Sequence, residues 1–154
     1  MKKIKSIIFT YSIILLFILC GCNSKNLGDK LTIFEGDRLE DRVIVYCTGY
    51  SFGSCKAGIY VVPTYEKHYD EKGNYAEYVE TAKSNEKWII AKTIQINDNK
   101  ENYWIISKDF SLENVDCNKV SCDSIIQSHV TGALNYQEFT AKTKELGINL
   151  KFEK

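Results

Sequence analysis

Apolar and polar residues alternate in several short runs along the chain, and each run predicts a β-strand. The clearest run covers residues 88–96, where Trp88, Ile90 and Ile94 share one face. An Asn/Asp-rich turn at 97–100 separates it from a second run at 103–107. Two alternating runs around such a turn predict a β-hairpin, which we expect at the centre of the sheet.

Shorter runs predict the remaining strands, at residues 31–34, 43–47, 58–63, 75–80 and 148–152. The Gly-containing loop between the second and third of these predicts a long-looped hairpin. Pro63 lacks a backbone N–H group, so it should end its strand or place it at a sheet edge. The segment at 148–152 is short and terminal, and it predicts a final edge strand.

The sequence predicts the start of a helix near the C-terminus. Asn135 can cap a helix, and Glu138 can complete a capping box three residues later. Gly147 stands where a left-handed C-terminal cap belongs. These signals predict a helix over 135–146, with a shorter helix at 122–129. Together the elements predict an α+β fold, namely an antiparallel β-sheet of about five or six strands with one C-terminal helix packed on it.

The first residues follow a different pattern. Lys2, Lys3 and Lys5 precede an apolar run at 7–19. A membrane-spanning helix needs about 20 apolar residues, so this run is short for one. A basic start followed by a short apolar run instead predicts a secretory signal peptide.

The end of this run, Leu19-Cys20-Gly21-Cys22, resembles the lipobox of bacterial lipoproteins. The resemblance implies that Cys22 carries a diacylglyceryl group and that cleavage precedes it. It also implies that the mature chain is held at a membrane by lipid. The alternatives are an ordinary signal peptide with a coincidental cysteine, or a membrane-spanning helix. In a double-membraned bacterium, Asn23 implies sorting to the outer membrane, with the domain on the periplasmic face. In a single-membraned bacterium, the domain would lie outside the cell.

The predicted organisation is therefore a lipoprotein signal peptide at 1–21, a lipidated tether at 22–30 and one globular domain at 31–154. Loss of the signal peptide removes three lysines and leaves 17 basic and 20 acidic residues, a net charge of −3. A mildly acidic domain argues against a nucleic acid partner.

Four cysteines remain in the predicted mature domain beyond Cys22. An even number of cysteines in an exported domain indicates disulfide bonds. We expect the two local pairs, Cys47 with Cys55 and Cys117 with Cys122. A zinc site with four thiolates is the alternative, but the spacings of seven and four residues fit it poorly.

Part of the chain also resembles an uncharacterised family of small bacterial lipoproteins. The resemblance rests on Lys87-Trp88-Ile89-Ile90-Ala91-Lys92, Tyr103-Trp104-Ile105-Ile106, Gly132-Ala133-Leu134-Asn135, Glu138-Phe139 and Glu145-Leu146-Gly147-Ile148. It covers about residues 87–148 and implies a strand pair followed by a short helix. It implies no catalytic residue.

Motifs for catalysis are scarce. The sequence has no Gly-rich phosphate loop, no Gly-x-Ser-x-Gly and no His-Glu-x-x-His, and we expect no metal and no cofactor. His68 and His129 are the only histidines. They allow a two-histidine metal site or a hydrolytic pair of His68 with Asp70, whereas the simpler interpretation makes both loop residues. Glu77 and Glu80 read as part of a solvated acidic face.

Four tyrosines in the polar middle of the chain are the best candidates for binding a partner: Tyr65, Tyr69, Tyr75 and Tyr78. Tyrosine combines a large contact area with a polar tip, although it is also a common strand residue. We therefore predict a non-enzymatic lipoprotein that binds a protein partner, of an immunity or accessory envelope type. The alternatives are a peptide- or glycan-binding protein that uses Trp88 and Trp104, and an envelope hydrolase that uses His68.

Overall fold

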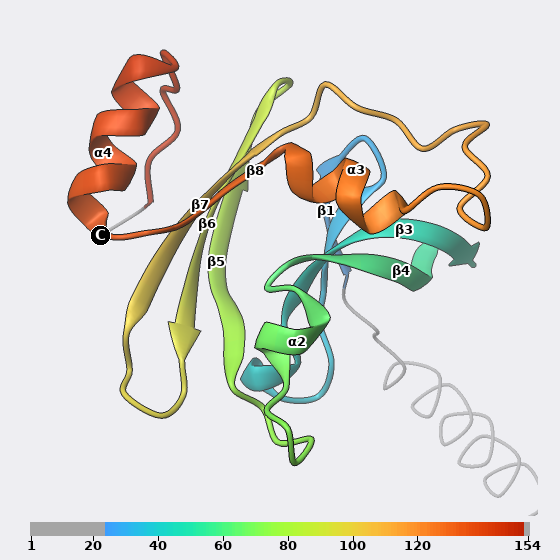
Figure 1. Cartoon of the computed structure of the whole chain (residues 1–154), viewed down its shortest axis with the longest axis horizontal. Coiled ribbons are helices and arrows are strands. Elements are labelled where there is room, and N and C mark those ends of the chain that lie inside the picture. Colours follow the sequence, from blue (N-terminus) through green and yellow to red (C-terminus); the bar gives the residue numbers. More distant parts are fainter. Residues whose placement is uncertain (1–23, 153–154) are drawn as a thin grey trace, which may run out of the picture.

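The computed structural model describes residues 24–152 and folds them into two antiparallel sheets of four strands each (Figure 1). The first sheet contains β1 (Ser24–Gly28), β2 (Leu31–Phe34), β3 (Val43–Ser51) and β4 (Ser54–Val62). The second contains β5 (Glu77–Ser84), β6 (Trp88–Gln95), β7 (Glu101–Ser107) and β8 (Val130–Leu134). The helices are η1 (Leu39–Asp41), α2 (Tyr65–His68), α3 (Cys122–Ser128) and α4 (Tyr136–Glu145).

The α+β class holds in outline, but the prediction of a single sheet of five or six strands is wrong. Within each sheet the strands follow one another in sequence order, so both sheets are meanders. The link between the sheets runs through α2, where β4 ends and no strand continues the pairing. Alternation along the sequence identifies strands, but it does not say which strands share a sheet.

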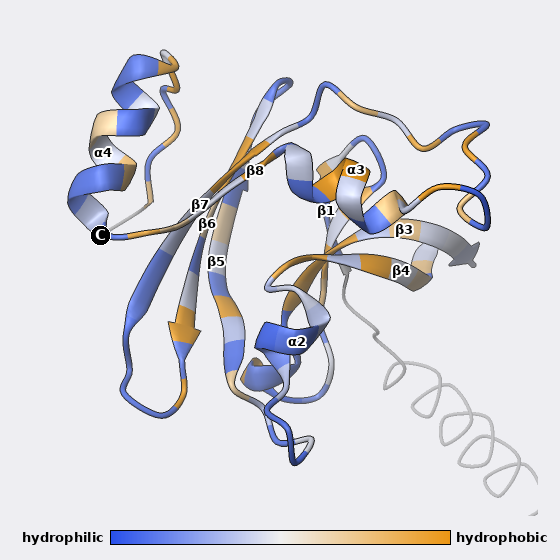
Figure 2. Cartoon of the chain, viewed as in Figure 1, coloured by the Kyte–Doolittle hydropathy of each residue, from blue (hydrophilic) through white to orange (hydrophobic). Residues whose placement is uncertain are grey.

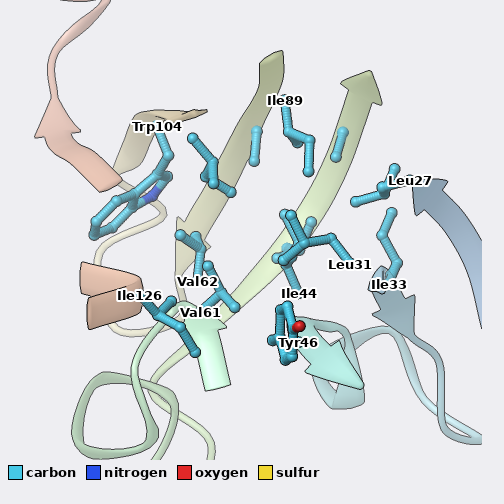
Figure 3. Close-up of a cluster of buried hydrophobic side chains, with 14 residues drawn as sticks. Leu27, Leu31, Ile33, Ile44, Tyr46, Val61, Val62, Ile89, Trp104 and Ile126 are labelled. Atoms are coloured by element: carbon cyan, nitrogen blue, oxygen red, sulfur yellow. The ribbon is translucent and has the colours of Figure 1, made fainter. Parts of the chain in front are cut away.

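The main core lies between the two sheets. The first sheet contributes Leu31, Ile44 and Val61, and the second contributes Ile89 and Trp104 (Figure 3). Ile44, Val61 and Ile89 have no exposed surface, and Ile126 of α3 closes the core at one side. Burial of each large aliphatic side chain contributes about 1.5–3 kcal/mol, so this cluster is the main stabilising contact between the sheets.

The outer face of the second sheet carries a separate apolar layer beneath α4. Ile90 and Ile105 of the sheet pack with Phe139 of α4 and with Ile148 beyond it. Figure 2 shows α4 as a mostly hydrophilic helix with a few apolar positions, which fits a helix that packs only one side on the sheet. The central strands β6 and β7 are therefore covered on both faces, which confirms the expected central position of their hairpin.

The capping signals of α4 are confirmed. Asn135 Oδ1 accepts hydrogen bonds from the backbone N–H groups of Gln137 and Glu138, at 2.9 and 3.0 Å. Glu138 Oε2 accepts the backbone N–H of Asn135 at 2.9 Å. Gly147 follows the helix with a φ of +65°, which is the left-handed conformation expected there.

Two edge segments differ from the predictions. Most of the predicted tether at 22–30 is β1, which pairs with β2 and buries Leu27 to 3 % exposure. Residues 148–152 form no strand; Leu150 and Phe152 instead pack on the apolar layer beneath α4. A third segment, β8, was not predicted; its sequence contains Gly132, and glycine weakens a strand.

The predicted disulfide bonds are present in the local pairing. Cys47 of β3 is joined to Cys55 of β4, and Cys117 is joined to Cys122 at the start of α3. The signal peptide and the predicted lipidation site, Cys22, lie outside the described residues. Within residues 24–152, no helix is long and apolar enough to cross a bilayer.

Candidate functional site

A carboxyl group is buried at one end of the inner face of the second sheet. Glu77, the first residue of β5, is only 3 % exposed. Its Oε1 accepts hydrogen bonds from Thr93 Oγ1 and, at 3.1 Å, from Asn102 Nδ2. Thr93 Oγ1 in turn accepts the indole N–H of Trp104 at 2.8 Å. A buried carboxyl group is costly unless it is hydrogen-bonded, and these neutral donors compensate part of that cost.

Strand register explains why these side chains meet. Thr93 of β6 lies opposite Asn102 of β7 and, on its other side, opposite Val79 of β5. Trp104 follows Asn102 by two residues and so points to the same face. The indole belongs to the apolar core, and the carboxyl group lies where that core ends. The chain of hydrogen bonds from Trp104 to Glu77 therefore fixes the carboxyl group in one position.

A pocket of about 480 Å³ opens beside this carboxyl group. Its wall includes Lys67, Glu77, Asp98, Lys100 and Asn102. Both hydrogen bonds that Glu77 receives end on Oε1, and no buried side-chain oxygen or nitrogen of the described residues lacks a partner. The second oxygen, Oε2, is therefore accessible from the pocket.

Two lysines line the same pocket as this carboxyl group. Lys67 of α2 places Nζ 5.0 Å from the centre of the Trp104 ring, in a cation–π contact. Lys100 follows the β6–β7 turn, where its backbone N–H donates to Asp98 Oδ1 at 3.0 Å. Among the described residues, neither lysine forms an ion pair, and neither does Glu77. The pocket thus presents unpaired charges of both signs.

A cluster of aromatic rings surrounds His68 on the other side of α2. His68 is 1 % exposed, and its Nδ1 lies 2.7 Å from the backbone oxygen of Glu77. Its ring centre lies 4.4 Å from Tyr69, 5.3 Å from Tyr75 and 5.8 Å from Tyr60. Burial lowers the pKa of His68 below its usual 6.5. These contacts make His68 a packed core residue.

Tyr75 links this cluster to η1. Its hydroxyl donates to Asp41 Oδ1, and this hydrogen bond is the main cause that lowers the pKa of Asp41 and raises that of Tyr75 to about 12. Asp41 also accepts the backbone N–H of Arg38 at 2.8 Å. The aromatic cluster therefore holds the η1 segment through one carboxyl group.

Replacement of Tyr75 by phenylalanine tests this link. The free energy of unfolding of the variant should be about 1 kcal/mol lower at pH 7, because the variant loses one charge-assisted hydrogen bond to a partly exposed carboxylate. Folding lowers the pKa of Asp41 below its ordinary value of 3.8. The stabilisation that the ionised Asp41 gives to the fold is therefore present above pH 3.8 and is lost as the pH falls through the lower pKa of the folded state. Urea unfolding at pH 7 and at about pH 2.5 should show the difference between the two proteins shrinking in acid. An equal difference at both pH values would contradict the link.

Three of the four predicted binding tyrosines come together, and one does not. Tyr65, Tyr69 and Tyr75 belong to the aromatic cluster, and Tyr65 also contacts Tyr60 at 5.5 Å between ring centres. Within residues 24–152, Tyr78 makes no ring contact with them. Tyr65 is 59 % exposed, whereas the neighbouring tyrosines are half-buried. Sequence reasoning missed Tyr60, although it lies in a predicted strand shortly before the tyrosine-rich segment.

The predicted histidine chemistry finds no geometric support. Asp70 accepts hydrogen bonds from Lys72 and Asn74 within its own turn and does not meet His68. His129 lies 2.9 Å from Asp109, apart from His68. No group of three or more possible metal ligands occurs within the described part of the chain.

The interpretation of Glu77 and Glu80 as one solvated face is wrong for Glu77. Glu80 is exposed and pairs with Lys92, whereas Glu77 is buried. A bulge between Val79 and Thr81 changes the register of β5 with β6 between the two acids. The alternation of apolar and polar residues could not reveal this burial, because both acids read as polar positions of one strand.

The two tryptophans do not form one surface. Trp104 is 3 % exposed and lies in the core between the sheets. Trp88 is half-buried and packs on the opposite face of the same sheet, in the layer beneath α4. A peptide or glycan site that uses both indoles therefore has no common face to occupy.

The tip of the β3–β4 hairpin is a second exposed feature. Phe52 and Gly53 form its two-residue turn, with φ values of +50° and +77°. Such turns favour Asn and Gly, and phenylalanine is costly in the left-handed conformation. The Phe52 side chain is nonetheless fully exposed, at 105 %, and Tyr50 beside it is 57 % exposed. The Cys47–Cys55 disulfide braces the hairpin below the tip.

Comparison with protein-family models, with curated proteins and with solved structures found no match to this chain.

Proposed function

We propose that this chain is a membrane-anchored envelope lipoprotein that binds a protein partner through the β3–β4 hairpin and performs no catalysis itself. The observation that carries the proposal is Phe52, a large apolar side chain held fully in solvent at a turn that disfavours it. Within residues 24–152, this ring lies outside the apolar clusters of the core. Backbone strain clusters at functional sites, and neighbouring exposed apolar side chains, here Phe52 with Tyr50, mark interaction surfaces.

The hairpin has the properties of a binding element. Tyr50 and Phe52 supply aromatic area, which dominates the energetics of protein interfaces. The disulfide between Cys47 and Cys55 restricts the strands that carry them, so less conformational entropy is lost when a partner binds. At one end of the first sheet, Ser24 pairs with Phe34 and Phe34 pairs with Val43. The hairpin tip lies at the opposite end of this sheet.

The proposed anchor adds a geometric constraint. Cys22 precedes the first residue of β1 by two positions, and two extended residues span about 7 Å at most. Lipidation at Cys22 would therefore hold the folded domain close to the membrane, without the longer tether expected from the sequence. The proposed location is the bacterial envelope, at the periplasmic face of the outer membrane where two membranes exist.

Site-specific photo-crosslinking in living cells tests the proposed function. A benzophenone amino acid at position 50 should yield one discrete protein adduct, because that side chain lies beside Phe52. The same group at Tyr136, which is 63 % exposed on α4, should yield none and is the matched control. Palmitate labelling that is lost in Cys22→Ser checks that the chain reaches its membrane. Adducts with lipid alone, or equal adducts from both positions, would contradict the proposal.

Phe52→Asn separates binding from stability at the same residue. Asn tolerates the left-handed conformation, so the free energy of unfolding of the variant should be about 0.5–1 kcal/mol higher than that of the parent protein. The same variant should lose most of the protein adduct formed at position 50. A purely structural role for Phe52 predicts the reverse, namely a less stable variant with an unchanged adduct.

A further inference from the structure

The geometry points to a second binding site, in the Glu77 pocket, for a small zwitterionic ligand that carries the ammonium and carboxylate groups of a free amino acid. This site lies on the second sheet and α2, whereas the proposed protein-binding hairpin belongs to the first sheet. The inference does not rest on the function of the hairpin.

The first argument is the state of the Glu77 carboxyl group. It is 3 % exposed, it receives two neutral hydrogen bonds on Oε1, and it has no cationic partner among the described residues. Buried carboxylates are normally paired with a cation, because neutral donors compensate only part of the desolvation cost. The accessible oxygen, Oε2, faces a pocket that an external ammonium group can enter.

The second argument is the rigidity of this acceptor. The hydrogen bonds that run from Trp104 to Thr93 and from Thr93 to Glu77 hold the carboxyl group, and Asn102 holds it from the neighbouring strand. All four side chains come from paired strands, so the acceptor is preorganised before any ligand arrives. Preorganised charged groups bind ligands at a lower entropic cost than mobile ones.

The third argument is the pair of lysines in the lining of the pocket, which also includes Asp98. Lys67 and Lys100 line the pocket with ammonium groups that form no ion pair among residues 24–152. Lys67 is held over the Trp104 ring at 5.0 Å, outside ion-pairing range of Glu77. A ligand with both signs of charge would pair with Glu77 through its ammonium group and with a lysine through its carboxylate. The volume of about 480 Å³ is in the range of small-molecule sites.

Indole N–H resonances of the full chain in detergent micelles provide a direct test. The chain has two tryptophans, and the Trp104 N–H belongs to the Glu77 network, whereas Trp88 lies on the opposite face of the sheet. Each of the common L-amino acids is titrated in turn. At least one should shift the Trp104 signal to saturation and leave the Trp88 signal in place. Failure of all of them to move Trp104 would overturn the inference.

Derivatives of the amino acid that shifts the Trp104 signal test its ammonium and carboxylate groups separately. The N-acetyl derivative lacks the ammonium group and should not shift the Trp104 signal. The amide derivative lacks the carboxylate and should bind more weakly. Lys67→Ala should likewise weaken the binding of the free amino acid.

Glu77→Gln should weaken binding about tenfold or more, because it removes the charge that the ammonium group meets. Glutamine retains an acceptor for Thr93 and Asn102, so the Trp104 signal should persist and report that the domain is folded. Glu80→Gln is the matched control, since Glu80 lies on the same strand but is exposed and pairs with Lys92. A shift that survives in Glu77→Gln, or that the N-acetyl derivative produces equally, would overturn the inference.

Discussion

Gly132→Ala is expected to destabilise the domain by about 3–5 kcal/mol, since it combines overpacking with backbone strain. A Cβ atom at this position would lie 2.4 Å from Cε3 of Trp104 and 2.9 Å from the backbone oxygen of Tyr103. Neither neighbour can give way. The indole is buried and hydrogen-bonded to Thr93, and the Tyr103 oxygen is part of the backbone of a central strand. Urea unfolding followed by tryptophan fluorescence measures the loss.

Gly147→Ala is the matched control for this prediction. Gly147 also has a positive φ, of +65°, but a Cβ atom there would meet nothing within 4 Å. Its replacement should therefore cost only the backbone strain, about 1 kcal/mol. Equal losses for the two variants would mean that the contact of Gly132 with Trp104 contributes nothing.

Trp104→Ala is expected to cost about 4 kcal/mol, whereas Trp88→Ala should cost about 1–2 kcal/mol. The Trp104 indole is 3 % exposed between the two sheets, so its removal leaves a cavity and takes away the N–H group that donates to Thr93 Oγ1. Trp88 is half-buried on the outer face, where solvent can fill the space. Far-ultraviolet circular dichroism in urea follows unfolding without relying on either indole.

The same pair of variants tests the arrangement of the two sheets. If the second sheet faced the first with its other surface, Trp88 would be the costly residue and Trp104 the tolerated one. A larger loss for Trp88→Ala than for Trp104→Ala would therefore contradict the placement of the core. The result also bears on the Glu77 pocket, because Trp104 begins the hydrogen bonds that hold its carboxyl group.

Local signals in the sequence were sufficient for several elements. The β6–β7 hairpin follows from two alternating runs and an Asn/Asp turn, and β2 has the predicted bounds. The capping box of α4 follows from Asn135 and Glu138. The disulfide bonds follow from an even cysteine count and short spacing. In each case the interacting residues are close in sequence, so the pattern that predicts them also brings them together.

The candidate site could be predicted only in part. The tyrosine-rich segment indicated where aromatic residues gather, but Tyr60 and the buried His68 join that cluster through tertiary contacts. Glu77 carried no distinguishing signal among 20 acidic residues. Its importance depends on Thr93 and Asn102, which are 16 and 25 positions away. The exposure of Phe52 depends on the two-residue turn that β3 and β4 adopt.

The sequence alone therefore determined the strands with clear alternation, the capped helix, the cysteine pairs and the prediction of an exported lipoprotein. Only the tertiary structure decided that the strands form two sheets, which tryptophan lies between them and which acid is buried. The physical reason is the range of the interactions. Turns, caps and short disulfide loops are set by neighbours in the chain, whereas the facing of two sheets is set by burial of apolar area between distant segments.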